Sequence, residues 1–262
     1  MKHLAFAAAL AASTTIDGVA QAQSVAALIG DDTIAIVDVA AKKVANTMKV
    51  SGATGGALIG IDVRPADSML YGVTADGTIW TIDAATGKAM QKSKLDMPLP
   101  GAQAMTVDFN PAADRLRIIA ADGTNLRVNV DDGKLTKDGN LKFAEADMHK
   151  GETPRIVAGA YTNSIKGAKE TTLYDIDATI GGLIKQAPPN DGVLNAVGKL
   201  GVKAEAYAFD IAADANGGNE GWLMAGETLY RVDLASGKAT EHGKIDGVGT
   251  MVVRDIAILP KM

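Results

Sequence analysis

Aspartate side chains recur along the chain at a spacing that could gather several carboxyl groups at one site. Successive positions of the series lie 45 to 53 residues apart, and each aspartate directly precedes an apolar residue. Crowded carboxylates repel one another unless a cation lies among them, and hard oxygen ligands suit Ca²⁺. The pattern therefore predicts a candidate Ca²⁺ site, although nothing in the sequence requires a cofactor. The positions are Asp62, Asp108, Asp210 and Asp255, with Tyr161 in the remaining place of the series.

The same aspartates have two other interpretations. In the structural one, each carboxyl accepts hydrogen bonds from main-chain N–H groups of the neighbouring repeat and so fixes the distance between repeats. In the catalytic one, two carboxyls face each other across a channel mouth, as in a hydrolase or lyase that acts on a cell-envelope or extracellular substrate. Because the positions are nearly identical, the sequence does not assign an acid and a base.

Basic and amide side chains make the segment 104–141 more polar than its repeats. Arg115 and Arg117 alternate along one expected strand and share a face, from which they could bind a carboxylate or a phosphate. The alternative is that they pair with Asp114, Asp131 or an aspartate of a neighbouring repeat. Two further candidates lie where the repeat symmetry breaks, before a lengthened loop. The candidate ligand-binding residues are Asn110, Arg115, Arg117, Arg127, Tyr161 and Asn163.

The segment 104–141 also shows the elements that must position these side chains. Apolar and polar residues alternate in it, with Leu126 and Val128 on one face and Arg127 on the other, which is the period of a β-strand. Clusters of Asp, Asn, Gly and Pro interrupt the alternation and predict turns. The expected strands are residues 104–110, 115–121, 124–129 and 134–141.

The rest of the chain repeats this unit with a period typical of four-stranded propeller blades. A second anchor recurs in the hairpin before the last strand, where Asp or Asn stands five residues before Lys, as in Asp83 to Lys88 and Asp233 to Lys238. The third repeat departs from the pattern, with a longer first loop at 163–170 and a proline pair, Pro188-Pro189, in place of the hairpin. The expected blades are residues 57–95, 104–141, 155–200 and 204–245.

The two ends of the chain supply one more blade between them. Three strands are expected at 25–30, 33–38 and 44–50, and one at 252–259. Pairing the last strand with the first would remove the open sheet edges. We therefore predict an all-β fold, a five-bladed β-propeller of four-stranded antiparallel blades that the C-terminal strand closes by pairing with the N-terminal segment. An open β-sandwich built from similar meanders is the alternative.

Residues 1–22 have the pattern of a secretory signal peptide, with Lys2 at the start, an apolar run at 4–12 and a small-residue ending at Ala22. Residues 23–262 would then form a single propeller domain in the periplasm or outside the cell. No later run is apolar and long enough to predict a membrane span.

Composition limits the chemistry and the partners of this domain. The chain has no cysteine, which excludes disulfides, thiolate nucleophiles and zinc–thiolate sites. A formal net charge of −5 gives no electrostatic reason to expect nucleic acid as a partner. We expect a monomer that binds an unknown small molecule, glycan or envelope protein.

Several motifs resemble those of a known family. They read DFNPAADRLRIIAADGTNLRVNVDDG, from Asp108 to Gly133, followed by AYTNS, TLYDID and QAPPNDG. Together they resemble a bacterial exported family that is catalogued only as a domain of unknown function, number forty-three ninety-four. The resemblance covers nearly all of the chain after residue 22. It implies a propeller-like exported protein and carries no activity, substrate or catalytic residue.

Overall fold

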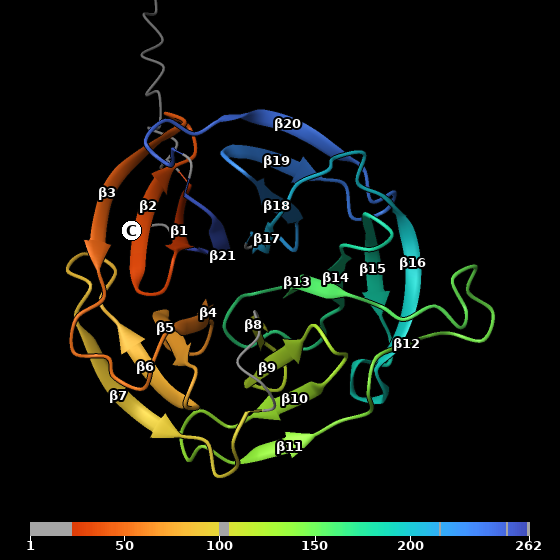
Figure 1. The fold of residues 1–262 in the computed structure, drawn as a ribbon, viewed down its shortest axis with the longest axis horizontal. Helices are drawn as coiled ribbons and strands as arrows, with labels where there is room; N and C mark the ends of the chain where they lie inside the picture. Colours follow the sequence, from red (N-terminus) through yellow and green to blue (C-terminus); the bar gives the residue numbers. More distant parts are fainter. Residues whose placement is uncertain (1–22, 100–104, 215, 250, 261–262) are drawn as a thin grey trace, which may run out of the picture.

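Five β-sheets surround a central axis in the computed structural model, which describes residues 23–99, 105–214, 216–249 and 251–260 (Figure 1). This arrangement confirms the predicted five-bladed β-propeller and excludes the open sandwich. The expected signal peptide, residues 1–22, lies outside the described residues. Within them, we find no helix with the length and apolar character needed to cross a membrane.

Each blade is a meander whose first strand lies nearest the axis (Figure 1). Blade I joins the two ends of the chain, and blades II to V follow in chain order. Blade I contains β21 (Val253–Ile258), β1 (Ser24–Ile29), β2 (Thr33–Asp38) and β3 (Lys43–Lys49). Blade II contains β4 (Leu58–Arg64), β5 (Met69–Thr74), β6 (Thr78–Ile82) and β7 (Ala89–Lys94).

The remaining blades repeat the same order, with one extra strand in blade IV. Blade III contains β8 (Met105–Asn110), β9 (Arg115–Ala120), β10 (Asn125–Val128) and β11 (Leu135–Lys137). Blade IV contains β13 (Ile156–Tyr161), β14 (Leu173–Asp177), β15 (Gly182–Gln186), β16 (Val193–Lys199) and the added β12 (Lys142–Phe143). Blade V contains β17 (Tyr207–Ala213), β18 (Asn219–Ala225), β19 (Thr228–Val232) and β20 (Ala239–Lys244).

The C-terminal strand closes the ring, as the sequence predicts. Strand β21 pairs antiparallel with β1, so that Val25 lies opposite Ile258 and Leu28 lies opposite Asp255. Ile256, on β21, packs in one buried cluster with Val25 from β1 and with Trp222 from blade V. The closing strand therefore completes a sheet, covers the edge of β1 that would otherwise be open, and joins two blades through apolar contacts.

The expected hairpins form in blades II, III and V, and their glycines have positive φ. At Gly133, φ is 75°, and a Cβ atom at this position would lie 1.9 Å from the carbonyl oxygen of Lys94 in blade II. Any other residue would collide with the neighbouring blade there. The glycine therefore serves both the turn and the close approach of two blades.

The last strand of blade III differs from the prediction. It ends at Lys137 rather than at 141, because the carboxyl of Asp138 turns inward to bind Arg117 and Arg127. The chain then crosses to the next blade, where β12 pairs parallel with β16. The second proline of the pair in blade IV begins a short 3₁₀ helix, η1 (Pro189–Asp191), and the main-chain N–H of Gly139 donates to the carbonyl of Asn190 there.

Ring closure makes a testable contribution to stability. We expect Ile256→Ala to lower the free energy of unfolding by about 2–5 kcal/mol, because the lost side chain leaves a cavity among buried residues of blades I and V. Met90→Ala is the control, since this side chain is 62% exposed and should change stability by about 0.5 kcal/mol or less. Urea unfolding measures both, and equal losses would contradict the contribution assigned to β21.

Candidate functional site

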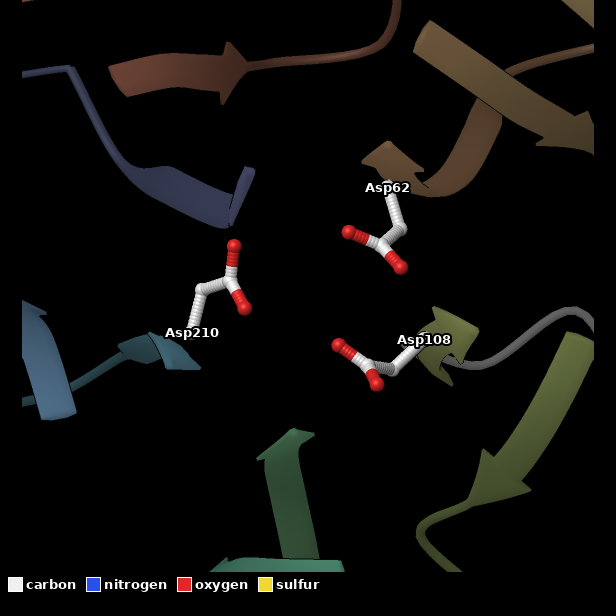
Figure 2. A group of neighbouring side chains, drawn as sticks. All are labelled: Asp62, Asp108 and Asp210. Atoms are coloured by element: carbon white, nitrogen blue, oxygen red, sulfur yellow. The ribbon is translucent and has the colours of Figure 1, made fainter. Parts of the chain in front are cut away.

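Four innermost strands place the recurrent aspartates around the axial channel. Asp62 is on β4, Asp108 on β8, Asp210 on β17 and Asp255 on β21, and none is more than 7% exposed. Figure 2 shows the carboxyls of Asp62, Asp108 and Asp210 turned toward one another across the channel. Each of these three offers an oxygen atom within 4.8 Å of the other two. Asp255 stands outside this group of three.

Each aspartate also joins its own blade to the next one. Asp62 Oδ2 accepts the main-chain N–H of Phe109 at 2.7 Å, and Asp108 Oδ1 accepts that of Tyr161 at 2.9 Å. Asp210 Oδ2 accepts the N–H of Ile258 at 2.6 Å, and Asp255 Oδ2 that of Ile61 at 2.9 Å. These hydrogen bonds match the structural interpretation of the series, and they span every junction except that between blades IV and V.

Tyr161 takes the fifth place of the series without supplying a carboxyl. Its side chain is fully buried, and its hydroxyl accepts a hydrogen bond from Arg117 Nε at 3.1 Å, toward blade III rather than blade V. Blades IV and V are instead linked near one end of the channel. There the side chain of Asn219 accepts the main-chain N–H of Asn163 at 2.7 Å and donates to the side-chain oxygen of Asn163 at 2.8 Å.

Burial raises the pKa of the ring carboxyls. Desolvation is the largest cause that raises the pKa of Asp62, Asp108 and Asp255 well above the ordinary value, and repulsion between the carboxyls adds to it. Desolvation likewise raises the pKa of Asp210 to about 6, against the opposing effect of two main-chain N–H donors, from Ile258 and Ile211. The cluster thus favours protons or another positive charge among its oxygens.

A cavity of about 830 Å³ opens at one end of the channel. Asp62 and Asp210 both line it, so two of the three clustered carboxyls are reached from this side. Its wall comes mostly from residues of blade V and from the connections that follow β4 and β13. The polar lining residues are Gln23, Ser68, Ser164, Lys166, Asp214, Asn219 and Glu220. We call this cavity the channel mouth.

Sequence reasoning missed most of this wall. The lengthened loop at 163–170 marked the right region, and Asn163 does lie beside the mouth in its hydrogen bonds to Asn219. Nothing in the sequence of the turn at 216–219 predicts a binding site, because glycine and asparagine are ordinary turn residues. Its neighbours Asp214 and Glu220 enter the cavity wall only because blades IV and V meet there.

The arginines of blade III form a separate group. Arg117 is 1% exposed and donates to Asp138 at 2.6 Å, to Asn125 at 2.8 Å and to Asn190 at 2.8 Å. Arg115 and Arg127 line a smaller cavity, of about 250 Å³, that shares no lining residue with the channel mouth. The structure therefore brings two predicted arginines together but keeps them apart from the aspartates.

Asn110, a predicted ligand-binding residue, and the two aspartates considered as arginine partners make other contacts in the structure. Asn110 caps a turn, since its side-chain oxygen accepts the N–H groups of Ala112 and Ala113 at 3.0 and 2.8 Å. Asp114 and Asp131, considered as partners of Arg115 and Arg117, bind Arg64 of blade II instead, at 2.6 and 3.0 Å.

Comparison with known proteins identifies relatives without a described activity. A family model described as a domain of unknown function, DUF4394, matches residues 33–257, while no curated protein matches the chain. A protein of unknown function from Bacteroides thetaiotaomicron is 15% identical, with a TM-score of 0.53 over 93% of this chain and 66% of its own. Another from Bacteroides caccae is 12% identical, with a TM-score of 0.46 over 91% and 99%. These likenesses concern the fold alone.

The raised pKa of Asp210 predicts how stability depends on pH. The native state binds this proton more tightly than the unfolded chain, so the free energy of unfolding should fall as pH rises from 3.8 toward about 6. In Asp210→Asn the fall over this interval should be smaller, because the group that titrates is gone. Urea unfolding at a series of pH values measures both slopes, and an unchanged slope in the variant would refute the assignment.

Proposed function

We propose that this chain, which belongs to the family described as a domain of unknown function (DUF4394), is a binding module whose site is the channel mouth. One observation carries the proposal. The mouth leads to Asp62 and Asp210, two of three buried carboxyls with oxygen atoms within 4.8 Å of one another. A cavity that ends on convergent polar groups with raised pKa values is typical of a binding site.

The chemistry of the cluster favours a hard divalent cation such as Ca²⁺. Each carboxylate oxygen has two lone pairs, so the oxygens that accept main-chain N–H groups keep one for a metal ion. Asp108 also has Oδ2, which accepts no hydrogen bond from the described residues. A cation would stabilise the ionised form that burial disfavours, and water from the mouth would complete the coordination.

The wall of the mouth favours a polar ligand above the cation. Asp214 and Glu220 add two carboxylates, against the single ammonium group of Lys166. None of the described lining residues is aromatic, so the wall offers no face on which a sugar ring or a base could stack. We therefore favour a small, hydroxyl-rich ligand, or a short glycan, held by hydrogen bonds and by the cation.

Catalysis by the same carboxyls has less support. A hydrolase or lyase would need one carboxyl as an acid and another as a base or nucleophile, and the unequal environments of Asp62 and Asp210 favour such a pair. However, both oxygens of each already accept main-chain N–H groups, from Val63 and Phe109 and from Ile211 and Ile258. A reacting carboxyl would have to leave the contacts that join its blade to the next.

Export is part of the proposal and rests on residues 1–22. The pattern of this segment suits a protein that works in the periplasm or outside the cell. N-terminal sequencing of the protein recovered from an expressing bacterium tests this. A mature chain that begins near Gln23 is the expected result, and retention of residues 1–22 in the cytoplasm would contradict it.

A Ca²⁺ titration followed by thermal unfolding tests the cation. At roughly 100 times the dissociation constant, binding should raise the melting temperature by about 5–10 °C. In Asp108→Asn the shift should disappear, because one of the three clustered carboxylates is lost.

Asp255→Asn is the matched control for that titration. Asp255 makes the same kind of hydrogen bond between blades, to Ile61, but stands outside the group of three. Asp255→Asn should have a lower melting temperature than the wild type when Ca²⁺ is absent. Adding Ca²⁺ should still raise its melting temperature by as much as in the wild type. Calorimetric titration of the folded variants gives a second reading, and a Ca²⁺ effect that is absent from the wild type or equal in all three proteins would refute the site.

A further inference from the structure

We propose that blade III carries a second binding site, a cationic pocket that takes a phosphoryl group. The pocket has a volume of about 250 Å³, and all of its lining residues belong to this blade. Three of them are cationic and two are neutral hydrogen-bonding residues. They are Arg115, Arg127 and Lys134, with Asn129 and Thr136. We call this the blade III pocket.

The register of the sheet brings these side chains to one face. Arg127 on β10 lies opposite Arg117 on β9 and opposite Thr136 on β11. Arg115 precedes Arg117 by two residues and so projects from the same face of β9. The main-chain N–H of Asn129 donates to the carbonyl of Lys134 at 3.0 Å, which places these two residues side by side beyond the ends of the strands.

The guanidinium group of Arg127 is held in a fixed orientation. Its Nε and Nη2 atoms donate to Asp138 at 2.6 and 2.9 Å, and Nη1 has no hydrogen-bond partner among the described residues. Asp138, whose side chain is 5% exposed, also accepts from the buried Arg117 at 2.6 Å. One carboxylate thus serves two guanidinium groups, and this part of the blade keeps a net positive charge.

Arg115 and Lys134 add charge that no neighbouring carboxylate neutralises. Arg115 Nη1 donates to the carbonyl oxygens of Ala113 and Asp114, at 3.4 and 2.8 Å, and both acceptors are uncharged. In the part of the chain that the structure describes, neither Arg115 nor Lys134 forms an ion pair. Asp114 and Asp131 bind Arg64 of blade II instead. The carboxyl of Asp132 accepts the main-chain N–H of Lys134 at 3.0 Å and forms no ion pair with its ammonium group.

The equivalent position in blade V shows that the fold does not need this excess of charge. Arg115 in blade III and Glu220 in blade V occupy equivalent positions. Arg115 pairs with Asn110 on the innermost strand of its blade, and Glu220 pairs in the same way with Ala212. Arg231 in turn corresponds to Arg127, and it forms an ion pair with Glu220 at 3.1 Å. Blade V therefore neutralises an arginine by placing a carboxylate where blade III has a second arginine. Blade III has arginine at both places and leaves its excess charge available to a ligand.

The donor set fits a tetrahedral dianion better than a carboxylate. Three cationic groups, with the hydroxyl of Thr136 and the amide of Asn129, surround one cavity from several directions. A phosphoryl group has three terminal oxygens and close to two charges, whereas a carboxylate has two oxygens and one charge. Arginine forms paired hydrogen bonds to such oxygens, and Lys134 can act as a mobile point charge. Arg117 and Asp138 act as positioning residues beneath the pocket.

Calorimetric titration with inorganic phosphate in a low-salt buffer tests the proposal. The wild type should bind phosphate, and Arg115→Glu should bind at least about tenfold more weakly. This variant copies blade V, so the new carboxylate should pair with Arg127 and leave the fold intact. Circular dichroism checks the fold. If this variant does not fold, Lys134→Ala, which alters an exposed side chain, should weaken phosphate binding in the same direction.

Matched controls separate a built site from diffuse surface charge. Lys137→Ala removes an exposed lysine of the same strand, β11, that does not line the pocket, and it should leave phosphate binding unchanged. Acetate, titrated into the wild type, should bind more weakly than phosphate. The proposal is overturned if the wild type does not bind phosphate, if Lys137→Ala weakens binding as much as Arg115→Glu, or if acetate binds as tightly as phosphate.

Discussion

The hydrogen bond from a main-chain N–H group to a buried carboxyl of the preceding blade is the interaction on which the ring depends. It fixes the distance between neighbouring inner strands at four junctions, for example from Phe109 to Asp62. Such bonds are strong when the acceptor is ionised, but burial opposes ionisation, and the opposition appears as a raised pKa. The carboxyls that hold the blades in place are therefore also the groups whose ionisation burial opposes. A positive charge in the channel would stabilise their ionised form.

Most of the fold could be predicted from the sequence, because short local patterns of residues define the repeat. We could predict the strands, the blade number and the closure by residues near Ile256 from three patterns. These are the alternation of apolar and polar residues, the turn glycines such as Gly133, and the recurrent aspartates. The prediction was wrong about the end of β11, at Lys137. That strand stops early because Asp138 binds Arg117 and Arg127, and a contact with side chains on two other strands has no local signature.

The candidate sites were less predictable, because each depends on where blades meet. The sequence identified the aspartate series but not which three members would converge, since Asp255 follows the same local pattern as Asp108. It likewise identified Arg115 without showing that Asp114 would bind Arg64 and leave Arg115 with no ion-pair partner among the described residues. The identity of a partner across a junction depends on the register of two sheets, which periodicity within one sheet does not determine.

The composite blade makes the order of synthesis matter. Strand β21 follows every other strand of the ring in the sequence, yet it occupies the innermost position of blade I and lies against β17 and β1. A nascent chain that lacks it has an unpaired edge at β1, and the ring cannot close until residues 253–258 are available. Closure of this propeller therefore follows the synthesis of its other four blades, and a chain terminated before β21 would be open to proteases rather than folded as a smaller ring.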